Sequence, residues 1–320
     1  MPSNNNNPNN NNVPLANLAQ AERVRPEVLP NDTIIENKFK LIELVSNHPL
    51  LGLTYNAINQ QGDGFIIKMD AEANLLSFVR SEAGFLHNAA KLNATEHFVE
   101  LAHGGKFKSY IYFATRFRPG PSLNDCWESM PNGKFTAGTA ARVVYSIVKA
   151  LEWVHTLGYL LRRIDPNVIK FDATTRQIYL SDLSSVRLDP RKIKMEVHVR
   201  WAGDPRYAPL SHHQGKTHEP KHDLEAALYL LVELTTGKLP WDDQPRDMIG
   251  SLKRQAATNQ TLFKDCPPQY AAIYTYITLL NNCDRIEYSQ IYSKLEETWK
   301  AAGTDSNKPY DWEAHMKAEQ

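Results

Sequence analysis

The spacing of apolar residues changes near the middle of the chain, and this change constrains the fold more than any other feature. Between residues 39 and 115 the apolar residues occur in short strand-like runs, separated by turns such as the one at residues 61 to 64. Beyond the Pro-Gly-Pro segment at 119 to 121 they recur every three or four residues, as in helices with one buried face. The sequence therefore predicts an α+β fold with two lobes, a small sheet-rich lobe and a larger helical one.

The expected helices can be placed from the same pattern. One helix is predicted within the small lobe, over residues 75 to 92, with Leu75 and Leu76 among its apolar positions. The large lobe is predicted to contain one helix that ends at Gly158 and another that ends at Gly237. Glycine suits these ends because it accepts the left-handed backbone conformation at a helix C-terminus. The crevice between the two lobes is the expected ligand site.

The chain is predicted to have three parts. Residues 1 to 30 are interpreted as a disordered tail, because the two asparagine runs around Pro8 offer almost nothing to bury. A self-associating asparagine-rich segment is the alternative for this tail. Residues 31 to 313 are expected to form the folded domain, with the small lobe over roughly 36 to 118 and the large lobe over roughly 119 to 302. Residues 303 to 320 are expected to form a C-terminal extension.

Composition narrows the functional classes. Lys plus Arg equals Asp plus Glu, at 36 each, so no overall field favours nucleic acid or an anionic membrane, and neither is expected as a partner. The cysteines Cys126, Cys266 and Cys283 are widely spaced and odd in number, which fits a reducing compartment. The chain shows no secretory leader and no apolar run of membrane-spanning length. We therefore expect a cytoplasmic protein, with the nucleus as the alternative.

Four stretches, in order along residues 36 to 313, are similar to motifs of one known family. The stretch FIIK at 65 to 68 is similar to a V-A-I-K strand, and Glu82 stands where the helix partner of that lysine is expected. GDPRYA at 203 to 208 is similar to G-T-x-R-Y-A-S, and HDLE at 222 to 225 with GKLPW at 237 to 241, and PYDWE at 309 to 313, are similar to later motifs. In these stretches the chain resembles the casein kinase 1 group of protein kinases, most closely its tau-tubulin kinase branch. The resemblance implies a bilobal protein-kinase fold.

The segment at 160 to 171 lies where that family carries its catalytic loop, H-R-D-x-K-x-x-N, followed by a strand pair and D-F-G. Aligned in this way, the base aspartate is replaced by Arg163, the lysine by Asp165 and the metal-binding asparagine by Val168. Asp182 is retained at the D-F-G aspartate, and Ser184 replaces the glycine. An arginine cannot act as a general base, and valine cannot coordinate a cation.

The phosphate-binding turn of the family is also altered. Its G-x-G-x-x-G pattern lets backbone N–H groups approach phosphates, since glycine has no Cβ. Residues 47 to 52, NHPLLG, match this turn, and only Gly52 is kept. Pro49 has no N–H group to offer, and Leu50 and Leu51 add bulk at the tip. We expect a closed or collapsed cleft, with a loop for a different ligand as the alternative.

Lys68, Glu82 and Asp182 are the residual candidates for cofactor binding. A partly buried lysine needs a counter-charge whether or not the site is active, so the retained pair fits both an active and an inactive protein. For the altered loop we prefer an ion pair of Asp165 with Arg163 or Arg162. The alternatives are Asp165 acting as a displaced base and Asn167 replacing the lost metal ligand.

Arg206 is the candidate for binding an anion or a phosphorylated substrate beside the cleft, a role that the family resemblance implies. Arginine suits this role because it binds phosphate and carboxylate in a bidentate manner. Lys253 or Arg254 would supply a second charge. The alternative is that Arg206 pairs with a carboxylate of this chain. The histidines at 212, 213, 218 and 222 match no standard metal-site spacing, so no metal is expected there.

The sequence thus predicts a catalytically inactive kinase-like protein, or pseudokinase, with no catalytic residue. It is expected to act as a scaffold or regulator that binds a protein, with a phosphorylated or acidic segment as the natural ligand. No cofactor is expected, although binding of ATP and Mg²⁺ without turnover stays open. The alternative function is a weakly active, atypical ATP-dependent Ser/Thr protein kinase that uses Lys68, Asp182 and a displaced carboxylate.

Overall fold

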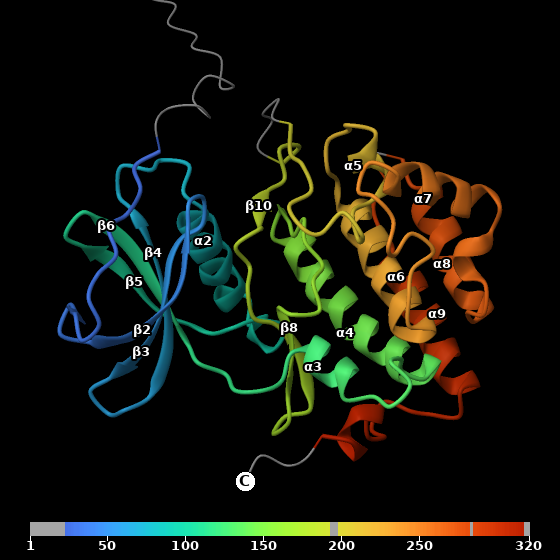
Figure 1. Cartoon of the computed structure of the whole chain (residues 1–320), viewed down its shortest axis with the longest axis horizontal. Coiled ribbons are helices and arrows are strands. Elements are labelled where there is room, and N and C mark those ends of the chain that lie inside the picture. The colour runs from blue at the N-terminus through green and yellow to red at the C-terminus, as the bar shows by residue number, and fades with distance from the viewer. Residues whose placement is uncertain (1–22, 193–197, 282–283, 317–320) are drawn as a thin grey trace, which may run out of the picture.

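The small lobe is built on an antiparallel sheet of six strands in the order β1-β2-β3-β4-β6-β5 (Figure 1). In this computed structural model, residues 23–192, 198–281 and 284–316 are described. The strands are β1 (Ile34–Ile35), β2 (Phe39–His48), β3 (Gly52–Asn59), β4 (Gly64–Ala71), β5 (Leu101–Phe107) and β6 (Tyr110–Arg116). Side chains on one face of the sheet form a buried cluster of their own, which includes Leu41, Tyr55 and Ile67. The opposite face is different, because Phe85 of α2 and Phe113 of β6 belong to the same buried cluster as the large-lobe helices.

Between residue 23 and the linker at 118, the α-helix of the small lobe is α2 (Phe78–Lys91), and it is shorter at its start than the sequence predicted. Leu75 and Leu76 are not helical, and their exposed fractions are 83% and 67%. The backbone is held extended at the N-cap residue Ser77, whose hydroxyl donates to the buried carboxylate of Asp70 at 2.6 Å. The assignment of Leu75 and Leu76 to a buried helical face was therefore wrong, because this contact delays the start of the helix.

The large lobe consists mainly of helices packed around α4 (Ala137–Thr156) and α6 (Pro220–Thr236), as Figure 1 shows. The other helices are α3 (Leu123–Glu128), α5 (Leu210–His213), α7 (Ile249–Thr258), α8 (Pro268–Leu279) and α9 (Tyr288–Ala301). Short strand pairs are formed by β7 (Tyr159–Leu160) with β10 (Arg187–Leu188), and by β8 (Ile169–Asp172) with β9 (Gln177–Leu180). Gly158 and Gly237 follow α4 and α6 with φ angles of 80° and 86°, as predicted for these helix ends. None of the helices in the described ranges is long and apolar enough to cross a membrane.

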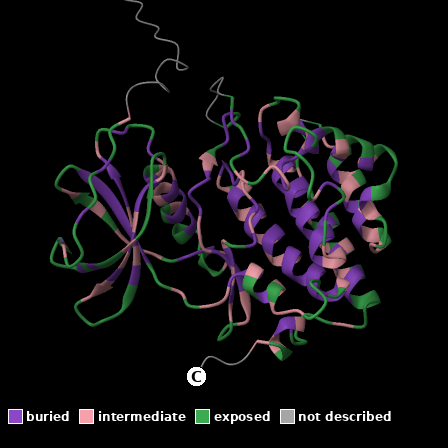
Figure 2. Ribbon diagram, viewed as in Figure 1, coloured by how far each residue is buried: buried purple, intermediate pink, exposed green. Residues whose placement is uncertain are grey.

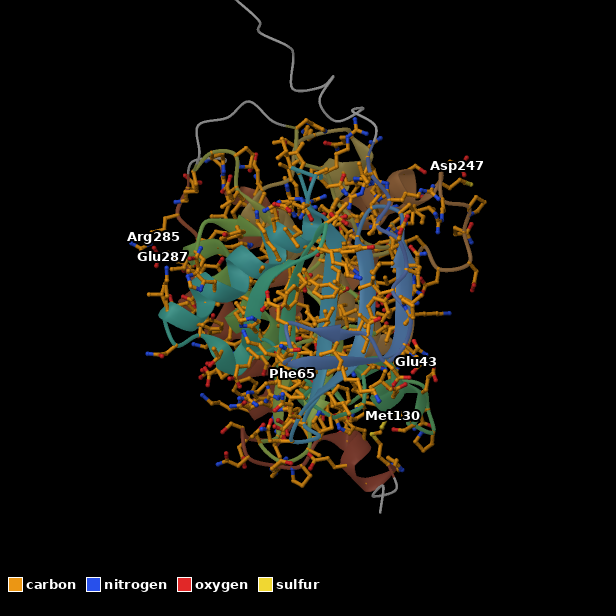
Figure 3. All side chains as sticks on the ribbon, turned by 90° about the vertical axis from the view of Figure 1, so that its left-hand side faces the viewer. Glu43, Phe65, Met130, Asp247, Arg285 and Glu287 are labelled. Carbon is orange, nitrogen blue, oxygen red and sulfur yellow. The ribbon has the colours of Figure 1, made fainter. Side chains whose placement is uncertain are left out.

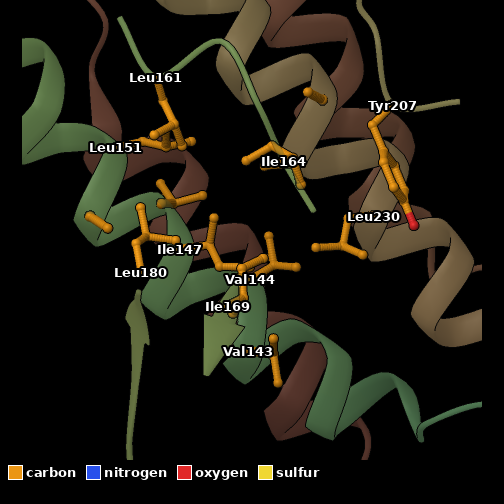
Figure 4. Close-up of a cluster of buried hydrophobic side chains, with 14 of the residues drawn as sticks. Val143, Val144, Ile147, Leu151, Leu161, Ile164, Ile169, Leu180, Tyr207 and Leu230 are labelled. Carbon is orange, nitrogen blue, oxygen red and sulfur yellow. The ribbon is translucent and has the colours of Figure 1, made fainter. Parts of the chain in front are cut away.

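Periodic burial along α4 forms the centre of the large-lobe core. Val143, Ile147 and Leu151 are at most 1% exposed and lie against Leu180 from β9 and Leu161 and Ile164 from the loop after β7 (Figure 4). Figure 2 shows the same division, with buried positions concentrated along α4 and α6. The apolar face of α4 thus packs against the altered catalytic loop, residues 161 to 168, and fixes its position.

The linker between the lobes is tied to the β8–β9 pair. Arg118 donates to Asp172 at 2.7 Å and to Gln177 at 3.1 Å, and its guanidinium lies 4.1 Å from the ring centre of Tyr179. Gly120 has a φ of 143°, and a Cβ atom there would lie 2.1 Å from the carbonyl oxygen of Phe171. The linker therefore passes against the large lobe at a point where only glycine fits.

The chain before the sheet differs from the predicted tail. Residues 23 to 30 lie against the small lobe: Arg23 donates to Asp70 at 2.7 Å, Asn74 exchanges two hydrogen bonds with Val24, and Leu29 bonds to the hydroxyl of Tyr55. Part of the expected tail is thus ordered, because buried polar groups of the sheet need these partners. The asparagine runs lie outside the described residues.

The C-terminal extension packs on the large lobe. The rings of Tyr310 and Trp312 stack at 4.4 Å, and Trp312 is 1% exposed. Asp311 accepts from the backbone N–H of Thr136, the N-cap of α4, at 2.6 Å, and Glu313 pairs with Arg176 at 2.9 Å. The aromatic and acidic residues of this segment therefore stabilise the start of α4 and the β8–β9 turn.

Candidate functional site

The altered catalytic loop is anchored by a buried carboxylate on α6. Asp223 is fully buried and accepts from the backbone N–H groups of Leu161 at 2.8 Å and Arg162 at 2.7 Å. Its oxygens also lie 3.0 Å from Nε2 of His155 and 2.8 Å from Nε2 of His218. Arg162 adopts a φ of 68°, an unusual conformation for a residue with a side chain, which these contacts hold in place.

Three of the predicted site residues come together where the two lobes meet. The ammonium of Lys68, on β4, lies 2.7 and 2.9 Å from the two carboxylate oxygens of Glu82, on α2. It also lies 2.6 Å from Oδ1 of Asp182, in the segment after β9. Glu82 further accepts from the backbone N–H of Leu183 at 3.0 Å. The three residues that the sequence offers as candidates for cofactor binding are therefore in direct contact with one another.

Both carboxylate oxygens of Asp182 are occupied by donors from this chain. Oδ1 accepts from Lys68 and from the backbone N–H of Ser184 at 3.0 Å. Oδ2 accepts from Nη1 of Arg163 at 2.9 Å and from the hydroxyl of Ser184 at 3.1 Å. The guanidinium of Arg163 therefore lies against the oxygen that faces the catalytic loop, a position where a metal-binding aspartate would present a free lone pair.

Arg163 also pairs with the second altered position. Its Nη2 donates to Oδ2 of Asp165 at 2.6 Å, and Asp165 accepts from the backbone and the side-chain amide of Asn167 at 2.9 and 3.0 Å. Of the two ion pairs considered for Asp165, the structure contains the one with Arg163. The side-chain amide of Asn167 donates to Asp165 within the loop, and this contact is not the one expected of a replacement metal ligand.

The five charged side chains form an alternating chain: Glu82, Lys68, Asp182, Arg163 and Asp165. Burial alone would raise the pKa of Asp182, but Lys68 and Arg163 outweigh it and hold that pKa well below its usual range. Burial likewise opposes the charge on Lys68, and Glu82 together with Asp182 raises its pKa above the ordinary value. Burial raises the pKa of Glu82 above its ordinary value, although Lys68 opposes this effect. The cluster contains three acidic and two basic groups.

The turn that replaces the glycine-rich loop is closed on itself. The imidazole Nδ1 of His48, the last residue of β2, accepts from the backbone N–H groups of Leu50 and Leu51, both at 3.1 Å. Arg23 donates to the carbonyl of Pro49 at 3.0 Å, which fixes the same turn from outside. The side chain of Leu50 is 53% exposed, so it does not fill the cleft. The turn therefore differs from a phosphate-binding loop mainly because its backbone N–H groups already donate to His48, and less because its side chains are large.

Arg206 and Lys253 were expected to bind an anion, and the structure places both against internal partners. The Arg206 guanidinium pairs with Glu233 and lies 3.0 Å from Asp242. Lys253 is 2% exposed and donates to the backbone carbonyls of Pro205, at 2.9 Å, and Ala208. Of the two readings of Arg206, the geometry matches the pairing with carboxylates of this chain. An external anion would have to displace these partners.

Several residues that shape the site were not identified from the sequence. His48 caps the turn, and its position two residues before Leu50 is a local signal for side-chain to backbone bonding. Arg23 and Arg118 act on the turn and on the linker from distant parts of the chain. Across the described ranges, no group of three His, Cys, Asp or Glu side chains could hold a metal ion.

Comparison with known proteins relates this chain to protein kinases. It is 30% identical over 225 residues to a probable serine/threonine-protein kinase of Dictyostelium discoideum, and the aligned region covers 67% of this chain and 44% of that protein. It is 27% identical over 205 residues to the piRNA biogenesis factor prde-1 of Caenorhabditis elegans, covering 59% and 39%. It is 27% identical over 209 residues to a putative casein kinase I of the same organism, covering 61% and 60%. The chain thus spans less than half of the first two relatives, and no family model matches it.

The solved structure of vaccinia related kinase 3 is similar to this chain with a TM-score of 0.69 and 18% sequence identity, over 89% of this chain and 96% of that one. Its likeness concerns the fold. Together with the sheet-rich small lobe, the helical large lobe and relatives named as Ser/Thr kinase and casein kinase I, it confirms the predicted α+β bilobal architecture. The chain has a protein-kinase-like fold.

Proposed function

We propose that this protein is a catalytically inactive kinase-like protein that acts as a protein-binding scaffold or regulator. One observation carries the proposal: the guanidinium of Arg163 lies 2.9 Å from Asp182 and 2.6 Å from Asp165, in the place of the machinery for phosphoryl transfer. The family reaction needs an aspartate that accepts the hydroxyl proton and an aspartate with an asparagine that hold magnesium. Here the position of the proton-accepting aspartate is occupied by Arg163, and the same arginine pairs with Asp182, the remaining candidate for a metal ligand.

The residues present do not fit a magnesium ion. A divalent ion at Asp182 would have to displace Arg163 from Oδ2 and Lys68 from Oδ1, leaving both cations facing the ion. Val168, at the position of the second ligand, offers only its backbone carbonyl, and Ser181 already donates to it at 2.8 and 2.9 Å. Magnesium requires oxygen ligands in near-ideal octahedral geometry, which this set does not supply.

The nucleotide phosphates would also lack their usual donors. The N–H groups of Leu50 and Leu51 are bonded to His48, and Pro49 has none. Lys68, which would meet the phosphates, is shared by Glu82 and Asp182. Without turnover, an intact bilobal domain offers its surface to other proteins, which supports a scaffold or regulatory role.

The test is phosphate transfer from radiolabelled ATP to casein, to tubulin and to the protein itself, with Mg²⁺ or Mn²⁺ present. We expect no incorporation above that of Lys68→Met, a variant that removes the residue an active cleft would need. A parallel thermal-shift measurement with ATP and metal should show no change in melting temperature. Incorporation by the wild type that disappears in Lys68→Met would overturn the proposal.

A second candidate function is a weakly active, atypical Ser/Thr kinase. It is favoured by the contact between Lys68 and Glu82 at 2.7 Å, which holds α2 as an active kinase would, and by relatives named as serine/threonine kinase and casein kinase I. In that case Asp165 would have to leave Arg163 and serve as base. A thermal shift with ATP that requires a divalent metal would favour this candidate over the first.

A further inference from the structure

Two adjoining cavities lie at one end of the small-lobe sheet, beside the turn between β1 and β2. Their volumes are about 430 Å³ and about 250 Å³, and Asn37, Lys38, Phe39, Asn59 and Gln60 line both. The larger cavity also reaches Arg116, and the smaller reaches Lys40. Gln61 and Phe65 also line the larger cavity, and we call these nine residues the sheet-end groove. The larger volume alone is that of an ordinary ligand pocket.

The β1–β2 turn, which forms one side of the groove, is held in place by contacts within the protein. Glu36 and Asn37, in the β1–β2 turn, have φ angles of 47° and 55°, which is strained for a glutamate. The turn is held across the end of the sheet to β5, because the Glu36 carboxylate lies 3.1 Å from Nε2 of His103. A Cβ atom at Gly105 would lie 2.9 Å from Glu36, so glycine permits this approach.

The floor of the groove is aromatic. The rings of Phe39 and Phe65 meet edge to face at 4.9 Å, and they are only 6% and 5% exposed. The guanidinium carbon of Arg116 lies 5.9 Å from the ring centre of Phe65. Figure 3, which looks at the small lobe, marks Phe65 at this lower part of the sheet. An apolar side chain from a ligand would rest on these rings, between amide groups and cations.

The charge of the groove has one sign. Lys38, Lys40 and Arg116 line it, and neither cavity is lined by an aspartate or glutamate. Each cation has a carboxylate partner just outside the lining: Lys38 lies 3.5 Å from Glu36, Lys40 pairs with Asp32 at 2.7 Å and Arg116 with Glu100 at 3.2 Å, and all three cations are about half exposed. Exposed pairs of this kind contribute little to stability, so an acidic ligand can compete for the cations at small cost.

We propose that the sheet-end groove binds an acidic peptide segment of a partner protein, with one aromatic or aliphatic side chain as its anchor. This rests on the proposed function as a protein-binding regulator and names the surface that would serve it. The amide side chains of Asn37 and Gln60 suit the N–H and C=O groups of a peptide, while the ring floor takes the anchor. A nucleic acid fits less well, because its affinity would rest on a few cations in a chain with no net charge.

The test uses the full chain and an array of short peptides in which Phe, Tyr, Leu or Ile is flanked by Asp and Glu. Matched arrays carry Ala at the anchor position or Lys in the flanks. We expect retention of acidic peptides with an anchor, and affinity about tenfold lower for each cation removed by Lys38→Ala or Arg116→Ala. Gln61→Glu adds a charge to the groove without breaking a pair and should weaken binding likewise.

Lys300→Glu is the matched control, since Lys300 is an exposed cation on α9 of the large lobe, and it should bind as the wild type does. Unchanged binding in all three groove variants, no preference for acidic over basic arrays, or displacement of the peptide by a single-stranded oligonucleotide would overturn the proposal. Melting curves confirm that each variant is folded. The ATP assay is independent of the groove, so a failure here leaves the loss of catalysis standing.

Discussion

Within the large lobe, the guanidinium of Arg163 in the altered catalytic loop donates to Asp182, in the segment after β9, at 2.9 Å. Through Asp182 it is connected to Lys68 and Glu82, and therefore to α2. The contacts that join the two lobes here are those of Lys68 with Asp182 and of the Leu183 N–H group with Glu82. Arg163 binds the same aspartate from the large-lobe side.

Replacing Arg163 should lower stability in a pH-dependent way. Burial would raise the pKa of both carboxyls, but Lys68 together with Arg163 holds the pKa of Asp182 below its usual range, and Arg163 together with Asn167 lowers the pKa of Asp165. Carboxylates with a lowered pKa stabilise the fold above their unfolded pKa, and this contribution disappears as the pH falls. We expect Arg163→Gln to cost about 2 kcal/mol at pH 7, and less below about pH 4. Urea unfolding at several pH values measures it. Arg285→Gln, at a 91% exposed position, is the control and should cost nothing.

Glu82→Ala should destabilise the small lobe. The variant removes two contacts to Lys68 and leaves the buried N–H of Leu183 without its acceptor. Because Asp182 still pairs with Lys68, the cost should fall near the lower end of the range for breaking a buried pair, about 3 kcal/mol. Hydrogen exchange should show α2 opening more often. Glu296→Ala, which breaks an exposed pair with Lys300, should change the unfolding free energy by less than about 0.5 kcal/mol.

Arg163→Asp alone should not produce phosphate transfer. It restores a carboxylate at the position of the base, but places it beside Asp165 and Asp182 with Lys68 as their remaining cation. Residues that act as a unit do not contribute additively, so one restored group gives little rate. The radiolabel assay on this variant decides the matter. Turnover by the single variant would mean that Val168 and the His48 turn do not prevent catalysis.

Lys253 should make stability rise with pH. Burial lowers the pKa of Lys253 to about 7, below the ordinary value near 10.5. Between these values the unfolded chain binds a proton that the folded protein does not, so the free energy of unfolding increases by up to about 1.4 kcal/mol per pH unit. Urea unfolding of the wild type and Lys253→Met between pH 7 and 10 tests this. The difference between the two proteins should change over that interval, and a constant difference would contradict the burial argument.

The lobes and the main helices were predictable because hydrophobic spacing depends on local geometry. The burial of Val143, Ile147 and Leu151 follows directly from a period of 3.6 residues. The start of α2 was not predictable, because Ser77 is held by Asp70, whose position depends on the folded sheet. For the same reason, the apolar character of Leu75 wrongly predicted that this residue lies on the buried face of the helix.

The sequence indicated which residues belong to the site, but it did not reveal most of the contacts between them. Motif spacing brought Lys68, Glu82 and Asp182 together, and the short separation of Arg163 from Asp165 suggested their pairing. The bond from Arg163 to Asp182 joins segments 19 residues apart, and no local pattern reveals it. Lys253 was expected at the surface, since its charge in the sequence does not show that backbone carbonyls surround it.

The alternating charges from Glu82 to Asp165 restrict how such a protein could change over time. Each internal member, Lys68, Asp182 or Arg163, touches two neighbours of opposite sign, so any single reversal breaks two attractions and creates two repulsions. A return to a metal-binding cleft would need Arg163 and Asp165 to change together, with an intermediate less stable than either end. Under the proposed function, these paired charges would make a loss of phosphoryl transfer hard to reverse.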